Sequence, residues 1–397
     1  MAETSNPNFR AIIVGGGPVG LCLAHAFTLA GIDYVLLERR ETPVEPSGFG
    51  LALWPHGVRI LDQLGLLEEG REMCLLMKDK YNLWPDGSEI GHSSLYEKIE
   101  QKVHCDDGNI VEGSIAVGCD GVHSRVRGIM RDLRLKSSGK MLDGETPMAA
   151  QYQLLAGYLP RILHMQPGRI WEVRDSGMSF QIFMLEREGW FLVYKRLPEP
   201  LPQYTKYTDD DAKAFAEDIM DHPVGQDMKF RDLWALRKWT RLVNLEEGFV
   251  QHWHQDRIVL VGDSVHKMTP NAGLGLNQGW QGVVALTNIL RALLSTNSEP
   301  DTKALTRAFE AYKNKTEKMA KDSAFLSKLY SRITSWHNVA YKLADYVGPY
   351  VGGDPVTFRL LASPIVKRGL ILDSIPEPGY KEGHIQWDNQ PYREEDE

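Results

Sequence analysis

Apolar runs and glycines alternate along the first 40 residues in the order of a strand–helix–strand unit. Residues 10–14 form a short apolar run before glycines, which is typical of a buried parallel strand. Residues 19–29 are rich in Ala and Leu and predict a helix that Gly31 ends. Residues 34–37 predict a second strand. The pattern therefore indicates a compact βαβ unit at the N-terminus.

The pattern changes twice further along the chain. A third buried strand is predicted over residues 114–118. Alternating stretches at 179–184 and 190–194 then predict antiparallel strands. Residues 257–262 return to the parallel-strand pattern, and a long helical zone covers about 277–345.

This order predicts an α/β nucleotide-binding domain that is interrupted by a second domain. We assign the discontinuous domain to residues 8–150 and 246–345, and an inserted, antiparallel β-rich substrate domain to 151–245. The C-terminal helices lead into an extension over 346–397 with an acidic tail.

Composition and charge exclude some partners. The net charge is −8, which argues against nucleic acid, because binding phosphate backbones requires clustered Lys and Arg. We expect no signal peptide and no spanning segment, hence a cytoplasmic protein whose association with membranes, if any, is peripheral. No CxxC pair is present, which favours reduced thiols over disulfides. The cysteines are Cys22, Cys74, Cys105 and Cys119.

A glycine-rich turn follows the first predicted strand, where residues 15–20 read GGGPVG and fit G-x-G-x-x-G. Gly15 permits the tight turn, Gly17 lets the backbone approach a pyrophosphate, and Gly20 allows close helix–strand packing. Glu38 ends the second predicted strand, where a carboxylate binds ribose hydroxyls. The motif predicts a dinucleotide site but does not separate FAD from NAD.

Two further motifs follow buried strands. Residues 118–127 read GCDGVHSRVR and by themselves indicate only a strand, an Asp-Gly turn and a basic helix start. Residues 261–277 read VGDSVHKMTPNAGLGLN and place Asp263 at the carboxyl end of a strand, where ligands bind in open α/β sheets. Gly273 and Gly275 then bring backbone N–H groups to the next helix start. The structural alternative is a loop with Asp263 as a helix cap.

Together these motifs resemble those of the FAD-dependent monooxygenases of the p-hydroxybenzoate-hydroxylase-like class. The second fits D-G-x-x-S-x-x-R and the third fits G-D-x-x-H-x-x-x-P-x-x-G-x-G-x-N. Within that class the chain resembles the fungal paxilline-pathway type, the epoxidases of indole-diterpene and meroterpenoid biosynthesis. Residues 51–65, 266–271 and 368–376 carry this finer resemblance, which extends over about residues 8–380.

The resemblance implies a Rossmann-type FAD-binding domain and the use of FAD, NADPH and O₂. Glu38 would bind the adenosine ribose, and Asp263 the ribityl–pyrophosphate region. Ala52 would line the flavin through its backbone, while Gly275 and Leu276 would present backbone amides to the isoalloxazine. The loop that contains Asp120 and Arg127 would serve both FAD and NAD(P)H.

The implied chemistry needs no protein nucleophile. Reduced flavin activates dioxygen, and one oxygen atom goes to an electron-rich alkene of a small, hydrophobic terpenoid. No catalytic residue is assigned. No metal site is expected either, because His252 and His254 lack carboxylates at a ligand spacing.

Two alternatives remain. One is a flavin-fold protein that cyclises or isomerises a terpenoid without oxygenation, or an impaired form of the enzyme. The other is a non-enzymatic dinucleotide-binding module, against which the complete third motif argues.

The chain departs from the family between its first two motifs. Glu38 and Asp120 lie only 82 positions apart, whereas the family carries a longer stretch that includes an FAD-binding arginine. The shortening falls near residues 96–105, and no residue is identified that replaces this arginine. Leu274 also stands where the family often has Gln.

Overall fold

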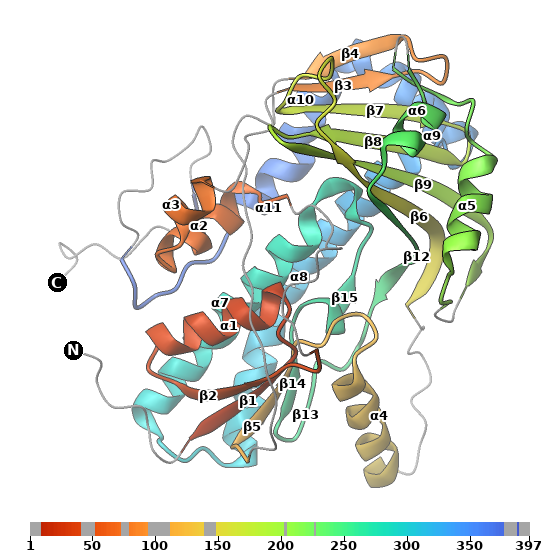
Figure 1. The fold of residues 1–397 in the computed structure, drawn as a ribbon. Coiled ribbons are helices and arrows are strands. Elements are labelled where there is room, and N and C mark those ends of the chain that lie inside the picture. Colours follow the sequence, from red (N-terminus) through yellow and green to blue (C-terminus); the bar gives the residue numbers. More distant parts are fainter. Residues whose placement is uncertain are drawn as a thin grey trace.

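The described residues form two large sheets and a two-stranded hairpin, and Figure 1 shows the smaller, mostly parallel sheet below the larger, curved one. This computed structural model describes residues 9–40, 52–72, 79–93, 112–138, 148–201, 205–225, 228–376 and 387–388. The shortened segment near 96–105 lies outside the described residues, as do Cys74 and Cys105.

The smaller sheet has five strands in the order β13-β14-β5-β1-β2. They are β1 (Arg10–Val14), β2 (Asp33–Leu37), β5 (Ile115–Gly118), β13 (His254–Gln255) and β14 (Ile258–Leu260). All except the edge strand β13 run in parallel. The four buried runs that predicted parallel strands therefore form one sheet, as the α/β fold class requires.

The register of these strands brings their carboxyl ends level. Val14 lies opposite both Leu37 and Gly118, and Gly118 lies opposite Leu260. The loops that follow the four strands therefore meet at one edge of the sheet, which is where open α/β sheets bind ligands.

Helices cover both faces of this sheet. They are α1 (Pro18–Leu29), α4 (Arg125–Ser138), α7 (Leu274–Thr296) and α8 (Thr302–Thr334), while α2 (Pro55–Gln63) and α3 (Leu67–Glu72) lie beyond α7. α1 and α7 pack closely because a Cβ on Gly279 would lie only 2.7 Å from Cγ2 of Val19. The Trp280 indole N–H also donates to the carbonyl of Pro18, at 2.9 Å.

The larger sheet has eight strands in the order β15-β12-β6-β9-β8-β7-β3-β4. The antiparallel strands expected at 179–184 and 190–194 are part of β8 and β9. Two members, β3 and β4, come from the N-terminal part of the chain, and β3 pairs with β7 in parallel. The strands are β3 (Asp79–Leu83), β4 (Glu89–Ser93), β6 (Ala149–Pro160), β7 (Arg169–Asp175), β8 (Met178–Met184), β9 (Glu188–Leu201), β12 (Trp239–Phe249) and β15 (His266–Lys267).

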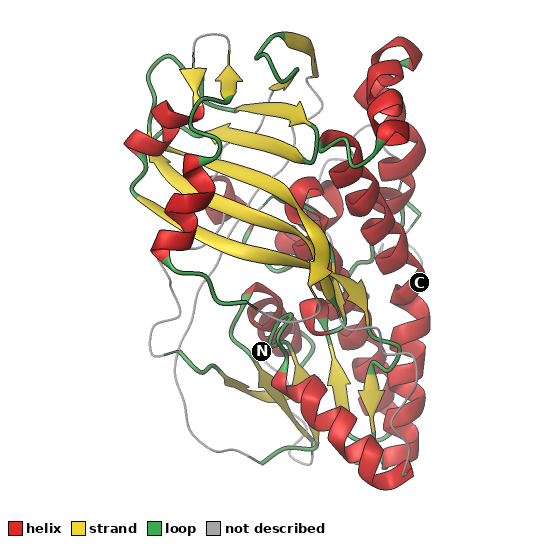
Figure 2. Cartoon of the chain, turned by 90° about the vertical axis from the view of Figure 1, so that its right-hand side faces the viewer, coloured by secondary structure: helices red, strands yellow, loops and turns green. Residues whose placement is uncertain are grey.

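The two faces of this sheet differ in what they bury. One face packs against α5 (Asp209–Glu217) and α6 (Phe230–Leu236) through an apolar core that includes Phe180, Phe191 and Phe230. The other face lies toward α8, as Figure 2 shows, and carries both apolar and polar side chains. A short hairpin of β10 (Pro223–Gly225) and β11 (Met228–Lys229) lies outside the sheet.

The predicted helical zone is divided and longer than expected. α7 and α8 are followed by α9 (Val339–Val347), η3 (Gly348–Val351), α10 (Gly353–Thr357), η4 (Phe358–Ala362) and α11 (Ser363–Lys367). Helical structure therefore continues about 20 residues beyond 345, where alternating glycines and prolines hid the pattern.

Candidate functional site

The glycine turn after β1 is shaped by its contacts. Gly15 has φ 108°, and its N–H donates to the carbonyl of Leu37 at 2.8 Å. A Cβ on Gly15 would lie 2.6 Å from the carbonyl oxygen of Cys119, and one on Gly20 would lie 1.9 Å from that of Gly15. A Cβ on Gly17 would meet nothing within 4 Å. Gly15 and Gly20 are therefore needed for packing, whereas Gly17 faces the open space that the motif requires for a pyrophosphate.

Glu38 follows β2 beside this turn. Its Oε2 accepts the backbone N–H of Gly16 at 2.7 Å, and its Oε1 accepts the N–H of Arg40 at 3.0 Å. Burial raises the pKa of the carboxyl, but these hydrogen bonds and the Arg40 guanidinium outweigh it and hold the pKa below its usual range. The carboxylate is therefore ionised at neutral pH and fixed at the edge of the glycine turn.

The Asp120 carboxylate caps helix α4. Its Oδ2 accepts the backbone N–H groups of Arg125 at 2.7 Å and Val126 at 3.1 Å, and its Oδ1 accepts the hydroxyl of Ser124 at 2.5 Å. The motif therefore forms a turn and a helix start, as its residues by themselves indicate, and the Asp120 side chain binds the first backbone N–H groups of the helix. Asp120 shapes the loop that follows β5.

Arg127 connects this loop to the third motif. Its guanidinium donates to the carbonyl of Ser264 at 2.9 Å and to that of Val122 at 2.5 Å. Ser264 in turn donates its hydroxyl to the carbonyl of Gly118 at 2.7 Å. The second and third motifs, which lie far apart in the sequence, are therefore joined by side-chain to backbone bonds.

Asp263 lies in η1 (Gly262–Ser264), directly after β14, and forms an ion pair with Lys267. Burial lowers the pKa of Lys267, but the Asp263 carboxylate outweighs it, so the pKa is raised and the ammonium stays charged. The Asp263 side chain remains about a third exposed, at 33%. It is therefore accessible at the carboxyl edge of the sheet.

Asn277 ties the start of α7 to the segment before α2. Its Oδ1 accepts the backbone N–H of Trp54 at 2.8 Å, and its Nδ2 donates to the carbonyls of Ala52 at 2.9 Å and Gly273 at 2.7 Å. The Trp54 indole N–H also binds the carbonyl of Ala272 at 2.9 Å. These bonds hold Ala52 beside the loop that begins α7.

The N-terminal turn of α7 contains Gly275 and Leu276. Gly273, which precedes the helix, has φ 63°, and a Cβ on it would lie 2.7 Å from that of Ala52. A Cβ on Gly275 would meet only Met268 Cγ, at 3.8 Å. These residues lie in the first turn, where an α-helix leaves backbone N–H groups without intrahelical acceptors, and Gly273 places this turn next to Ala52.

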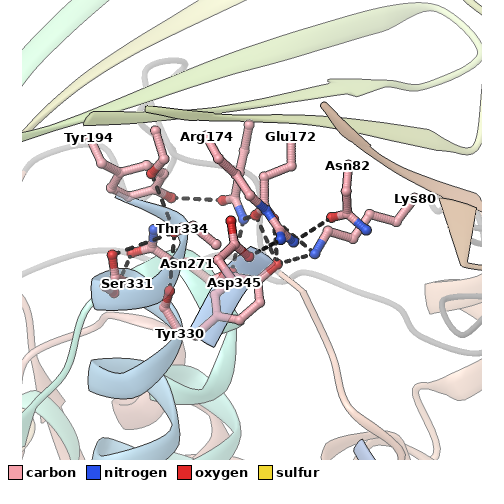
Figure 3. Close-up of polar contacts among 12 residues, drawn as sticks. Lys80, Asn82, Glu172, Arg174, Tyr194, Asn271, Tyr330, Ser331, Thr334 and Asp345 are labelled. Carbon is pink, nitrogen blue, oxygen red and sulfur yellow. Dashed lines mark hydrogen bonds and ion pairs between the residues drawn. The ribbon is translucent and has the colours of Figure 1, made fainter. Parts of the chain in front are cut away.

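A buried polar cluster lies between the larger sheet and α8, as Figure 3 shows. Its centre is Glu172, which is fully buried and pairs with Lys80 at 2.9 Å and Arg174 at 3.3 Å. Gln181 and Tyr330 each donate to Glu172, both at 2.8 Å. Burial raises the pKa of Glu172, but the two cations outweigh it, so the pKa is lowered and the carboxylate stays charged.

This cluster reaches the third motif through Asn271, which lies in η2 (Pro270–Ala272). Gln181 donates to the carbonyl of Asn271 at 3.2 Å and accepts the hydroxyl of Tyr194 at 3.0 Å. Ser331 of α8 donates to Asn271 Oδ1 at 3.0 Å. The sheet and α8 therefore both position the loop that precedes α7.

The contacts of Asn277, Lys267, Trp54 and this cluster are visible only in the structure. Asn277 and Lys267 stand inside the third motif, but a motif does not say which backbone groups a side chain binds. The sequence holds one signal for the cluster: Lys80 and Asn82 are two positions apart in β3, as Glu172 and Arg174 are in β7, so each polar pair shares one face of its strand. His252 and His254, which lack a metal-ligand spacing, were expected to have a surface or packing role, and Nε2 of His254 lies 3.0 Å from Oε1 of Glu310.

Comparison with known proteins agrees with this geometry. The family described as FAD binding domain matches residues 8–80 and 100–322. The chain belongs to the FAD-dependent monooxygenases. It is 32% identical to the FAD-dependent monooxygenase srdH of Neurospora crassa, over 96% of this chain and 98% of that one. It is 34% identical to spyC of Aspergillus fumigatus over 76% and 74%, and 30% identical to ausM of Penicillium brasilianum over 86% and 83%.

The monooxygenase is thus an oxidoreductase with FAD as its cofactor, of the fungal secondary-metabolite type. Solved structures share its fold. Klebsiella pneumoniae HpxO complexed with FAD and uric acid superposes with a TM-score of 0.69 over 91% of this chain and 97% of that one, at 17% identity. For 2,6-dihydroxypyridine-3-hydroxylase from Arthrobacter nicotinovorans the TM-score is 0.63, over 83% and 94%, at 14% identity.

The comparisons also show that a relative is longer than this chain within the aligned region. The match to the FAD binding domain is interrupted between residues 80 and 100. The alignment with srdH spans 445 positions, more than the 397 residues of this chain, so that relative carries residues that this chain lacks.

Proposed function

We propose that the monooxygenase uses NADPH and O₂ to epoxidise or hydroxylate a hydrophobic, prenylated or terpenoid intermediate. In the epoxidation, alkene, O₂, NADPH and a proton give epoxide, water and NADP⁺. One oxygen atom forms two new C–O bonds and the other leaves as water. The observation that carries the proposal is that three flavin-type motifs meet at one sheet edge, beside a second sheet that carries a mixed apolar and polar face.

The residues at this edge fit FAD. The space beside Gly17 and the adjacent Glu38 carboxylate suit a pyrophosphate and a ribose. Asp263 is accessible for a ribityl hydroxyl, and the free N–H groups at Gly275 and Leu276 suit the ring. Bound FAD supplies the electron transfer from NADPH to dioxygen.

The chain's own residues orient and enclose the reactants. Arg127 fixes the loop after β5 against η1, and Asn277 fixes Ala52 against the start of α7. Leu154, Ala156 and Leu245 form a small, buried apolar cluster in the larger sheet, which helps to keep the neighbourhood of the site poor in water. A water-poor surround suits an apolar terpenoid and favours oxygen transfer over side reactions.

The test is to incubate the FAD-loaded protein with NADPH and a prenylated aromatic that carries an electron-rich alkene, under ¹⁸O₂. Incorporation of one labelled oxygen into the product supports the proposal. A product that is cyclised or isomerised without label, and without NADPH consumption, would instead establish the non-oxygenating alternative.

The shortened segment leads to a second expectation from the same assay. A flavin less covered by protein is more open to water, so we expect weak FAD retention and NADPH oxidation that yields mostly hydrogen peroxide. Peroxide and product are measured per NADPH, for the natural chain and for a chimera with the relative's missing segment inserted after Glu100. Tight coupling in the natural chain would show that the shortening is harmless.

A further inference from the structure

A small cavity lies at one end of the larger sheet, where β6 and β9 meet the loop between α8 and α9. Its volume is about 160 Å³, and a liquid water molecule takes about 30 Å³, so it has room for an anion with four oxygen atoms. None of the described residues that line it carries a carboxylate, although the chain has net charge −8. These residues are Gln151, Arg196, Leu197, Pro198, Pro200 and His337.

Gln151 has its acceptor oxygen occupied. The Arg332 guanidinium pairs with Glu247 at 2.6 Å and donates to Oε1 of Gln151 at 2.8 Å. Arg332 is only 2% exposed, so this contact fixes the amide. The N–H groups of Gln151 Nε2 have no acceptor among the described residues. Gln151 therefore offers hydrogen-bond donors to a ligand, and not its oxygen.

Arg196 supplies a permanent positive charge. Its Nη1 donates to the backbone carbonyl of His337 at 2.8 Å, which fixes the guanidinium at the cavity. No carboxylate of the described residues forms an ion pair with it. The remaining N–H groups of the guanidinium therefore suit an oxyanion such as phosphate.

His337 has one ring nitrogen bonded within the protein. Ser335 donates its hydroxyl to the carbonyl of Ser331 at 2.6 Å, so its oxygen is left to accept the hydroxyl of Tyr152 at 2.8 Å. Tyr152 Oη in turn accepts Nδ1–H of His337, at 2.9 Å. Nε2 is thus the ring atom left for a ligand, and it donates a hydrogen bond once the ring is protonated.

The strongest charges acting on His337 are positive. Burial lowers the pKa of His337, and the charges of Arg196, Arg332 and Lys328 lower it further. Glu247 balances Arg332. An anion in the cavity would oppose the remaining positive charge and favour the protonated ring.

The cavity is connected to the second and third motifs. Glu246, the neighbour of Glu247 in β12, lies 3.7 Å from His123 of the second motif. Ser331, the neighbour of Arg332 in α8, donates to Asn271 of the third motif at 3.0 Å. The elements that build the cavity therefore also contact the loops of the expected flavin site.

We propose that this cavity binds a phosphate group through Arg196, Gln151 and the protonated ring of His337. Two sources carry this chemistry, the 2′-phosphate of NADPH and free phosphate. Binding of a phosphate is independent of oxygen transfer, and only its assignment to NADPH rests on the proposed function.

The first test is calorimetric titration of the FAD-loaded full chain with inorganic phosphate. Arg196→Gln and Gln151→Glu should each weaken binding about tenfold or more, because each removes a donor and adds no new one. Arg187→Gln, the same substitution of an exposed arginine just before β9, at the opposite end of that strand, is the matched control and should bind like the parent. Unchanged circular dichroism and FAD content show that the variants fold.

A second readout is the pKa of His337, measured by NMR and assigned with His337→Gln. Saturating sulfate, which stays a dianion over the titration, should raise this pKa in the parent and leave it nearly unchanged in Arg196→Gln. Parent protein that binds no inorganic phosphate, Arg196→Gln that binds it as tightly as the parent, or a His337 pKa that ignores sulfate overturns the proposal.

Adenosine 2′,5′-bisphosphate and AMP distinguish the two sources, because they differ only in the 2′-phosphate and neither requires turnover. If NADPH supplies the phosphate, the bisphosphate should bind about tenfold tighter than AMP, and Arg196→Gln should abolish this difference. Equal binding of the two nucleotides assigns the cavity to free phosphate. A protein that prefers the bisphosphate but incorporates no ¹⁸O would retain the phosphate site and refute the oxygenation.

Discussion

The backbone N–H of Trp54 donates a 2.8 Å hydrogen bond to the side-chain oxygen of Asn277, 223 positions further along the chain. The same amide donates to the carbonyls of Ala52 and Gly273, so one side chain fixes both borders of the expected flavin site. Because the amide uses its donor and acceptor ends together, no apolar or charged side chain can replace it.

Substituting Asn277→Ala should therefore lower the free energy of unfolding by about 1–3 kcal/mol and reduce FAD retention, because buried backbone groups lose their partners. Asn288→Ala is the matched control. Asn288 lies on the same helix and bridges the carbonyl of Ile371 and the N–H of Asp373, away from the sheet edge. Denaturant titration and flavin absorbance of the purified proteins measure both effects. Equal loss of flavin in the two variants would refute a specific role.

Glu38→Ala should weaken FAD binding by about 1–3 kcal/mol, because ribose hydroxyls and the Gly16 N–H lose an acceptor. Glu38→Gln keeps one acceptor oxygen, so its affinity for FAD should lie between those of the parent and Glu38→Ala. Asp33 begins the strand β2 that Glu38 follows, and its half-buried carboxylate pairs with Arg10 of β1, so Asp33→Ala should bind FAD normally. Fluorescence titration of apoprotein with FAD gives the affinities. An unaltered affinity in Glu38→Ala would remove Glu38 from the site.

Variants of Asp263 and of its partner Lys267 distinguish two roles of the Asp263 carboxylate, the ion pair and a contact with the cofactor. If the carboxylate binds the ribityl or phosphate region, Asp263→Ala should abolish flavin retention while circular dichroism stays largely unchanged. Lys267→Met removes only the ion-pair partner, so it should retain flavin. A yellow, active Asp263→Ala protein would show that Asp263 serves only the loop and its lysine.

The Glu172 cluster should behave as a structural unit. Glu172→Gln leaves Lys80 and Arg174 buried without their shared anion, which typically costs about 3–5 kcal/mol of stability. Glu310→Gln, which removes an exposed carboxylate paired with His254, should change stability little. Thermal and denaturant unfolding test this. A Glu172→Gln protein as stable as the parent would mean that the carboxylate is not required to balance the two cations.

Two buried histidines make stability depend on pH. Burial, with the Arg59 charge, lowers the pKa of His56 to about 3, and burial lowers the pKa of His266 to about 4 against the opposing pull of Asp263. Below pH about 6.5 the unfolded chain binds protons that the folded chain does not. The free energy of unfolding should therefore reach its plateau above that pH. Toward pH 4 it should fall, for each of the two histidines, by up to about 1.4 kcal/mol per pH unit.

Denaturant unfolding at pH 7, 6 and 5 measures this slope. His56→Gln should reduce it, whereas His123→Gln, a substitution of an exposed histidine, controls for the loss of an imidazole at the surface. If the slope is the same in His56→Gln as in the parent, a lowered pKa of His56 does not cause the pH dependence.

The sequence by itself determined the α/β class and the central sheet. Residues 10–14, 34–37, 114–118 and 257–262 are apolar apart from terminal glycines and their first residues Arg10, Ser114 and Arg257, a pattern that is typical of strands covered on both faces. The resemblance of its three glycine-containing motifs to those of the FAD-dependent monooxygenases also predicted the family, which the comparisons confirm. The roles of the individual site residues, and the domain boundaries, stay predictions.

Only the tertiary structure decided which partner each polar side chain has. Asp120 caps α4, Asn277 reaches Trp54, and Glu172 collects Lys80 from a strand that joins the larger sheet in parallel. Such contacts join residues that are distant in the sequence, and periodicity records only whether a position faces inward. The sequence likewise did not predict that α9 exposes apolar side chains, because its orientation depends on the ion pair of Asp345 with Arg174 in β7.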